Sequence, residues 1–105
     1  MSRAGASADA VNRLELMARL AERAPLRYTP AGVAAQDVVL EHQSLQAEAD
    51  GRRVVTLRLR AVAFGELAER LARIVPGQEL ACRGFLVSTR RGHGVVFHIQ
   101  TFETQ

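Results

Sequence analysis

The side chains best suited to chemistry in this chain are guanidinium groups. All 14 basic residues are arginine, and lysine is absent. Arginine is planar, permanently charged and able to stack on flat rings, so it suits contacts with phosphates and nucleobases. The formal net charge of +3 and the sequence pI of about 10.4 are compatible with an anionic partner. A compositional bias toward arginine explains the total equally well, so the positions of the arginines must decide.

Side chains that could catalyse a reaction or bind a metal are few and poorly spaced. His42 and His98 fall within strand patterns, where a hydrogen-bonded structural histidine is the common case, and His93 lies in a glycine-flanked loop. None of them has a recognisable nucleophile or metal-ligand spacing with Cys82 or with a carboxylate. A single cysteine excludes an internal disulfide and a cysteine-based metal site, and it is expected in the core. We therefore expect no enzyme activity, no cofactor and no metal.

The length of 105 residues, with 48% hydrophobic and 24% charged residues, is typical of one compact globular domain. The chain has no run of 18 apolar residues, which excludes a membrane-spanning helix, and its first residues show no secretory signal. We expect a cytoplasmic protein. Residues 1–11 are small, polar and aperiodic and predict a disordered leader, and residues 12–105 are expected to form the folded domain.

The hydrophobic pattern is mostly that of β-strands, in which apolar and polar residues alternate. The clearest case places Val55, Leu57 and Leu59 on one face, with Thr56 and Arg58 on the other. The first segment is ambiguous, because its Leu, Ala, Glu and Arg residues also favour a helix. The five predicted strands cover residues 14–20, 36–45, 52–64, 79–89 and 95–103.

The segments between the predicted strands contain turn signals and one helix. Two prolines and a glycine predict an extended turn at residues 25–32, and Asp50-Gly51 ends a predicted loop at residues 46–51. The hydrophobic period changes at residues 65–74, where one apolar stripe predicts a short helix that ends at Pro76-Gly77.

Five strands with one short helix between the third and fourth are the order of the oligonucleotide/oligosaccharide-binding (OB) fold. The sequence therefore predicts an all-β, five-stranded OB-fold barrel with the helix at one end. Other small α+β domains can share this order. In OB-folds, single-stranded nucleic acid lies across strands two and three, between the loops that join strands one to two and four to five.

Basic and flat side chains gather at those positions of the predicted barrel. If the second and third strands pair across the Asp50-Gly51 turn, Glu41 lies opposite or near Arg58 or Arg60, and a cross-strand ion pair would then neutralise one of these two arginines. Most strand aromatics lie in cores, so Phe85, Phe97 and Phe102 are expected there. The candidate contacts are Arg27 and Tyr28 in the first loop, Arg53, Arg58 and Arg60 on the third strand, and Arg90, Arg91 and His93 in the last loop.

Several short motifs resemble the bacterial family of primosomal replication protein N (PriB). The most specific is Val39-Leu40-Glu41-His42 followed by Gln43-Ser44-Leu45-Gln46. The resemblance implies an OB-fold homodimer that binds single-stranded DNA. It also implies action with the primosomal helicase (PriA) and other primosome proteins in restarting stalled replication forks. The match extends over residues 12–103 through Asn12-Arg13-Leu14, Pro25-Leu26-Arg27, Pro30-Ala31-Gly32, Pro76-Gly77 and Arg83-Gly84-Phe85.

The chain departs from the family pattern where binding residues would be carried over. The basic loop of the family corresponds to Arg90 and Arg91, in a shorter loop. Tyr28 replaces a basic residue, Gln43 an arginine, and Thr56 a stacking tryptophan. Because base stacking contributes about 1–3 kcal/mol per base, we expect weaker and more electrostatic DNA binding than in the strongest binders of the family.

Two other functions fit the same sequence. A protein-interaction adaptor of the primosome, with weak or incidental DNA binding, is consistent with the missing tryptophan. An OB-fold RNA binder would share the basic surface and would differ only in competition between RNA and DNA.

Overall fold

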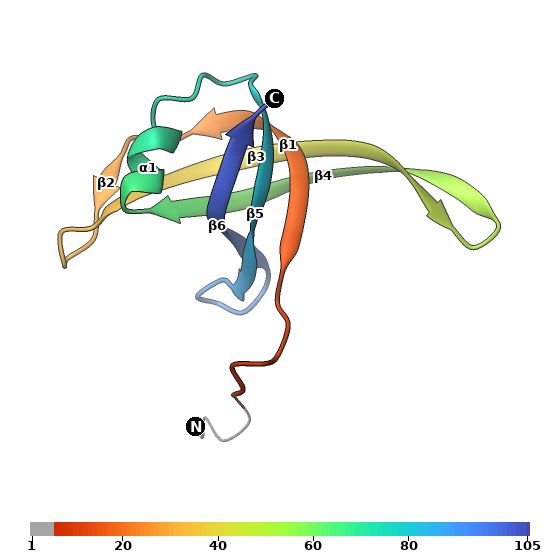
Figure 1. Ribbon diagram of the computed structural model, residues 1–105, viewed down its shortest axis with the longest axis horizontal. Helices are drawn as coiled ribbons and strands as arrows, with labels where there is room; N and C mark the ends of the chain where they lie inside the picture. Colours follow the sequence, from red (N-terminus) through yellow and green to blue (C-terminus); the bar gives the residue numbers. More distant parts are fainter. Residues whose placement is uncertain (1–5) are drawn as a thin grey trace.

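The computed structural model describes residues 6–105, which form one closed barrel of strands with a short helix (Figure 1). Residues 1–5 of the predicted leader lie outside the described residues, and residues 6–13 contain neither strand nor helix. No helix among the described residues is long and apolar enough to cross a membrane. The elements are β1 (Leu14–Arg23), β2 (Arg27–Tyr28), β3 (Ala34–Glu48), β4 (Gly51–Phe64), α1 (Glu66–Leu71), β5 (Glu79–Ser88) and β6 (Val95–Thr104).

The barrel closes because β1 pairs with two different strands. The sheet order is β1-β5-β6-β4-β3-β2, and an additional pairing of β1 with β3 completes the ring. The first half of β1 pairs with β5, and its second half pairs with β3 across an irregularity between Leu20 and Glu22. The parallel pairing of β4 with β6 is short, with Ala61 opposite Phe97 and Val62 opposite His98. The predicted OB-fold barrel is confirmed.

Within residues 6–105 the structure contains six strands, one more than the five predicted. Arg27 and Tyr28, expected within an extended turn, pair with Ala35 and Ala34 and form the two-residue strand β2. The helix therefore follows the fourth strand of the chain instead of the third. Two residues are too few for an alternating pattern, so the sequence carries no signal for this strand.

The core lies inside the barrel and is closed at one end by α1. Its largest fully buried side chains include Leu20, Leu40, Leu80 and Phe97. The helix is shorter than residues 65–74, and it directs Ala68 and Leu71 onto the barrel. The core position expected for Phe97 and Phe102 is confirmed. The same expectation for Phe85 is wrong, because its side chain lies on the opposite face of β5 from Leu80 and Cys82 and is only partly buried.

Strands β3 and β4 continue beyond the barrel as a two-stranded ribbon, which we call the arm (residues 42–57; Figure 1). Beyond Glu41, β3 has no pairing with β1, and β4 meets β6 only at residues 61–62. The loop predicted at residues 46–51 is wrong, since only Ala49 and Asp50 turn, with Ala49 at a φ of 53°. Both faces of the arm are exposed to solvent, so a strand there needs no apolar face. Its polar residues therefore look like those of a loop in the sequence.

Candidate nucleic-acid interface

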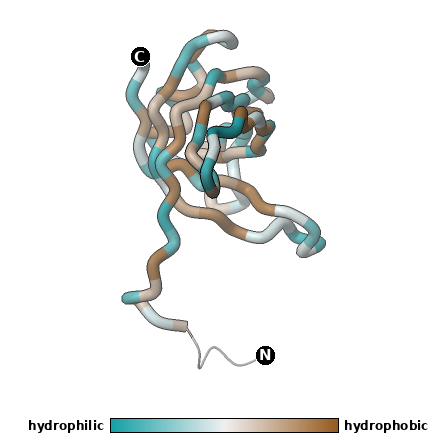
Figure 2. The backbone as a smooth tube through the Cα atoms, turned by 90° about the vertical axis from the view of Figure 1, so that its right-hand side faces the viewer, coloured by the Kyte–Doolittle hydropathy of each residue, from teal (hydrophilic) through white to brown (hydrophobic). Residues whose placement is uncertain are grey.

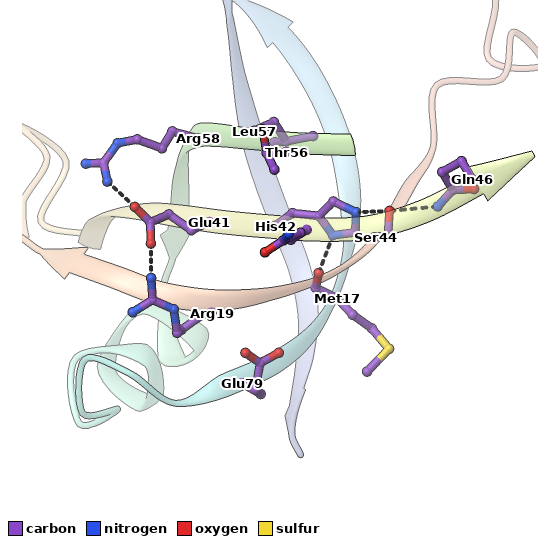
Figure 3. Close-up of a pocket in the computed structure, with 11 residues that line it drawn as sticks. Met17, Arg19, Glu41, His42, Ser44, Gln46, Thr56, Leu57, Arg58 and Glu79 are labelled. Atoms are coloured by element: carbon purple, nitrogen blue, oxygen red, sulfur yellow. Dashed lines mark hydrogen bonds and ion pairs between the residues drawn. The ribbon is translucent and has the colours of Figure 1, made fainter. Parts of the chain in front are cut away.

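Three of the predicted contact residues meet on the outer face of β3 and β4. Gln43 lies opposite Thr56, and Glu41 lies opposite Arg58. They line an open pocket of about 950 Å³ at the place where the arm leaves the barrel (Figure 3). The pocket lining is Met17, Arg19, Glu41, His42, Gln43, Ser44, Gln46, Thr56, Leu57, Arg58 and Glu79. Polar groups and a few apolar side chains therefore face solvent together at the base of the arm.

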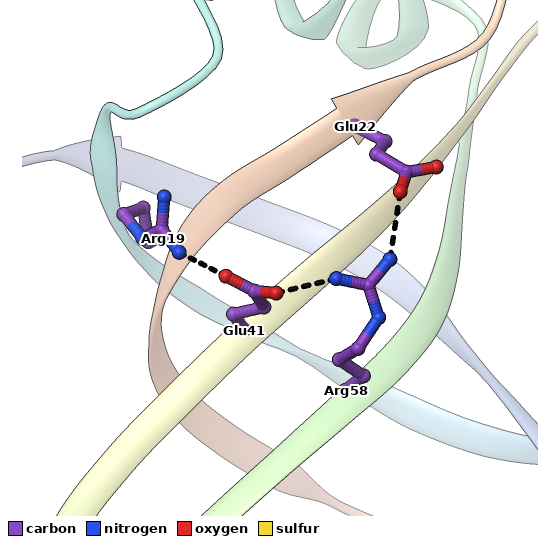
Figure 4. A network of polar contacts seen from close by, with 4 residues as sticks. All are labelled: Arg19, Glu22, Glu41 and Arg58. Atoms are coloured by element: carbon purple, nitrogen blue, oxygen red, sulfur yellow. Dashed lines mark hydrogen bonds and ion pairs between the residues drawn. The ribbon is translucent and has the colours of Figure 1, made fainter.

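A chain of ion pairs crosses this face from β1 to β4 (Figure 4). Glu41 lies between Arg19 and Arg58 and pairs with both, because register places the three side chains on one line across the strands. The second Arg58 nitrogen, Nη2, donates to Glu22 Oε2 at 2.7 Å. Hydrogen bonds to Glu22 and then Glu41 raise the pKa of Arg58. The predicted ion pair of Glu41 thus forms with Arg58, and the charge of this guanidinium is largely compensated.

Arg60 lies one outward position further along β4, opposite Val39. It forms no ion pair with any carboxylate within residues 6–105. A second hollow, of about 390 Å³, contains Arg60 together with Val39 of β3 and Val96 of β6. Arg60 is therefore a cation of the outer face that remains available to a ligand.

Two other predicted contacts already have acidic partners. Arg27 forms a two-pronged interaction with Asp37, with Nε and Nη2 at 2.5 and 3.1 Å from the two carboxylate oxygens. The hydrogen bond to Asp37 and its charge raise the pKa of Arg27. Arg53 Nη1 lies 3.4 Å from Glu48 Oε1 near the turn of the arm. Tyr28 has no such partner among the described residues and is 63% exposed.

The loop between β5 and β6 carries Arg90, Arg91 and His93, all exposed. Backbone hydrogen bonds from Gly92 N to Thr89 O and from Thr89 N to Gly94 O close the loop at its base. Within residues 6–105, neither arginine has an ion-pair partner. Figure 2 shows the loop projecting from the barrel with a hydrophilic tip. Two uncompensated guanidinium groups are thus presented together to solvent.

The predicted contacts do not converge on one spot. In Figure 1 the arm and β2 point toward opposite ends of the longest axis, and the β5–β6 loop lies below the barrel. The structure brings together Gln43, Thr56 and Arg58, with Arg60 beside them. It leaves the β2 residues and the loop residues at separate places. A ligand that contacts all of them must follow the surface of the molecule.

His42 holds the base of the arm. Its Nδ1 lies 2.6 Å from the Met17 carbonyl oxygen and its Nε2 lies 2.7 Å from Ser44 Oγ (Figure 3). Gln46 Nε2 donates to the same Ser44 oxygen at 2.9 Å. These contacts are satisfied together when Nδ1 carries the proton and Ser44 donates to Nε2. His42 therefore ties β3 to β1 just where their backbone pairing has ended, which is the structural role expected for it.

Sequence reasoning missed an aromatic row on the outer face of β4, β6 and β5. The centroid of the His98 ring lies 5.1 Å from that of the Phe85 ring, with 25° between the two planes. It lies 5.7 Å from the centroid of the Phe64 ring. The histidine ring has no hydrogen-bond partner among the described residues. Strand alternation places Phe85 opposite to Cys82 and could have indicated its outward direction. The neighbourhood of Phe64 and His98 depends on the parallel β4–β6 pairing, which has no local signal.

The single cysteine, Cys82, is buried and is not a ready nucleophile. Burial raises the pKa of Cys82 from 9.0 to about 11, so this thiol stays protonated at neutral pH. No group of three or more His, Cys, Asp or Glu side chains in residues 6–105 could hold a metal ion.

Comparison with known proteins identifies relatives over nearly the whole chain. A family model described as "another single-strand binding protein family" matches residues 12–101. Replication restart protein PriB of Bordetella pertussis is 42% identical over 91 residues, which are 86% of this chain and 85% of that protein. The PriB protein of Nitrosomonas europaea is 31% identical over 85% of this chain and 83% of its own.

A solved structure supports the same relationship. PriB from Ralstonia solanacearum has a TM-score of 0.84 and 42% identity, covering 91% of this chain and 99% of that one.

Proposed function

The chain belongs to this single-strand binding family, among the PriB replication restart proteins, and from that premise we propose that it binds single-stranded DNA during replication restart. The observation that carries the proposal is that Arg60 on the outer face and Arg90 and Arg91 in the loop are exposed and have no carboxylate partner within residues 6–105. Planar guanidinium groups suit the phosphates of a flexible single strand.

The proposed mechanism is neutralisation of phosphates with release of their counterions. Each phosphate neutralised on a single strand changes the slope of log affinity against log salt by about −0.7. Arg60 and the two loop arginines contribute directly. Arg58 contributes only after a phosphate replaces Glu22 or Glu41 as its partner, because both of its terminal nitrogens are occupied in the free protein. Binding is therefore electrostatic and tolerant of sequence.

The same proposal includes partners and setting. We propose a cytoplasmic, non-enzymatic homodimer that acts with the primosomal helicase (PriA) and other primosome proteins. Exposed apolar side chains on the arm, Leu45 and Val54, lie opposite each other and support a protein contact there. Light scattering would measure the oligomeric state, and a pull-down would measure helicase binding.

The main test replaces Arg90 and Arg91 together by alanine. We expect affinity for a labelled oligo-dT strand to fall and the salt slope to flatten by about 1.4, since two phosphate contacts are lost. The matched control removes two other exposed arginines, Arg70 in α1 and Arg73 just after it, away from the β5–β6 loop (Figure 1). If both double variants lower the affinity and flatten the salt slope equally, net charge and not the loop governs binding. If the Arg90/Arg91 variant changes neither the affinity nor the salt slope, the loop is not part of the site.

A protein-interaction adaptor remains the second candidate function. The observation that favours it is the compensated state of Arg58 and Arg27, together with threonine at position 56. Helicase capture by a protein that shows no salt-dependent binding to single-stranded DNA would select the adaptor. Preference for RNA over DNA in a competition titration would select an RNA binder instead.

A further inference from the structure

Three rings form a continuous row on the barrel surface away from the arm. Phe64 ends β4, and His98 and Phe85 face each other across the β5–β6 pairing. Val62, two residues before Phe64 on the same face, lies opposite His98 across the parallel β4–β6 pairing. His98 therefore lies between the two phenyl rings, with centroid separations of 5.7 and 5.1 Å.

This row is turned away from the core and remains accessible. Its neighbours in sequence, Phe97 and Ala63, point into the barrel and are fully buried. Phe64 is 41% exposed, and Phe85 and His98 are partly exposed. Within the described residues, the His98 ring has no hydrogen-bond partner that would explain its presence. A flat aromatic surface of this kind fits a flat ligand.

Cations border the row. Arg60 lies four residues before Phe64 on the same face of β4, next to Val96 of β6. The β5–β6 loop with Arg90 and Arg91 begins just beyond the pair Ser88–Val95, three rungs from Phe85–His98 and thus about 10 Å along the strands.

No carboxylate lies next to the row on the strands that carry it, since Glu79 and Glu103 lie at the ends of β5 and β6 that are far from Phe85 and His98. Residues 80–102 contain no aspartate or glutamate, and neither does β4. Glu22 and Asp37, which line the hollow beside Arg60, are engaged by Arg58 and Arg27. Flat rings between uncompensated guanidinium groups are complementary to a chain of phosphates that carries flat bases.

We propose that Phe64, His98 and Phe85 form a base-stacking platform, with the phosphates of the same strand lying over Arg60 and the β5–β6 loop. The platform rests on the proposed function, since it takes the single-stranded DNA proposed above. It places base stacking on β4, β6 and β5. The arm has threonine at position 56, and a threonine side chain offers no ring for stacking. The bound strand then leaves the arm at Arg60 and continues toward the loop.

The test removes each aromatic ring while keeping an apolar side chain at its position. Phe64→Leu and Phe85→Leu are titrated with labelled oligo-dT and with an abasic strand of equal length, at several salt concentrations. We expect each variant to bind oligo-dT at least about fivefold more weakly, with an unchanged salt slope, because stacking displaces no counterions. Binding of the abasic strand stays as in the parent protein. Val75→Ala, which trims an exposed apolar residue after α1, is the matched control and leaves both affinities unchanged.

A second measurement uses Phe64→Trp. The chain has no tryptophan, so this variant has a single indole, whose emission is expected to be quenched by oligo-dT and not by the abasic strand. Thermal melting confirms that each variant is folded. Parent-like oligo-dT affinity of both leucine variants, together with an unquenched indole, would overturn the platform. If the loop arginines still govern binding in that case, the proposed function stands; if the parent protein binds neither strand, the proposed function fails.

Discussion

Glu22 forms an ion pair with Arg58, one of the arginines proposed to contact DNA, and Glu22→Gln should therefore strengthen DNA binding. Glu22 is an exposed carboxylate whose only ion pair within residues 6–105 is with Arg58. Glu41, in contrast, holds both Arg19 and Arg58 and is more buried, so its replacement would disturb two strands at once. The glutamine side chain keeps the size of Glu22 and removes its charge. The neutral amide oxygen is a weaker acceptor for Arg58 Nη2 than the carboxylate, so a phosphate displaces it more readily.

The size of the effect follows from the charge count. One additional phosphate contact steepens the slope of log affinity against log salt by about 0.7. Between about 50 and 200 mM salt, a fourfold range, the gain of the variant over the parent protein should thus shrink roughly 2.6-fold. The exposed ion pair contributes little by itself, so the gain at the lower salt concentration should stay at about fivefold or less.

The assay is a titration of labelled oligo-dT by fluorescence anisotropy at four or five salt concentrations. Glu69→Gln on α1 is the control, because it changes the net charge from +3 to +4 in the same way without touching Arg58. A salt slope of Glu22→Gln equal to that of Glu69→Gln would refute the reasoning. It would show that Arg58 does not reach a phosphate or that Glu22 does not compete for it.

Two further predictions concern the barrel itself. Gly84→Ala should lower the free energy of unfolding, measured by chemical denaturation, by several kcal/mol, because the added Cβ would lie 1.8 Å from the His98 carbonyl oxygen. The control is Gly51→Ala, whose Cβ meets no atom within 4 Å. It should change the free energy of unfolding by less than about 1 kcal/mol. Similar stabilities of the two variants would contradict this close approach. The folded-state pKa of Cys82, about 11, lies above its usual value of 9.0, so its contribution to stability is complete below pH 9 and is lost as the pH rises through 11. The parent protein should therefore lose on the order of 2–3 kcal/mol more than Cys82→Ala over that range, and equal losses would show that the thiol is not buried in solution.

Much of the barrel could be predicted from local patterns. The alternation of Val55, Leu57 and Leu59 with Thr56 and Arg58 identified β4 because a strand directs successive side chains to opposite faces. The change of period after Phe64 identified α1 for the corresponding reason in helices. Errors arose where no local pattern exists, as in the two-residue β2, or where polar residues form a strand with two solvated faces, as in the arm.

The candidate site was predicted only in outline. The positions of Arg60, Arg90 and Arg91 followed from strand order and loop position, and each is exposed. The sequence also showed that Glu41 would meet Arg58 or Arg60, since both lie on the facing strand. It could not decide between them, because a shift of register by two residues preserves the face and exchanges the partner.

The sequence by itself therefore determined which residues face outward on each strand and which fold their order permits, because both depend on spacing along the chain. Only the tertiary structure decided which outward residues are neighbours. Barrel closure places Glu22 of β1 beside Arg58 of β4, and the parallel β4–β6 pairing places Phe64 beside His98. These contacts join residues 36 and 34 positions apart. The first contact shows that Arg58 already has an acidic partner, whereas Arg60 has none among the described residues. The second brings Phe64 into a row of three rings with His98 and Phe85. Both depend on distances in space, which the spacing along the chain does not give.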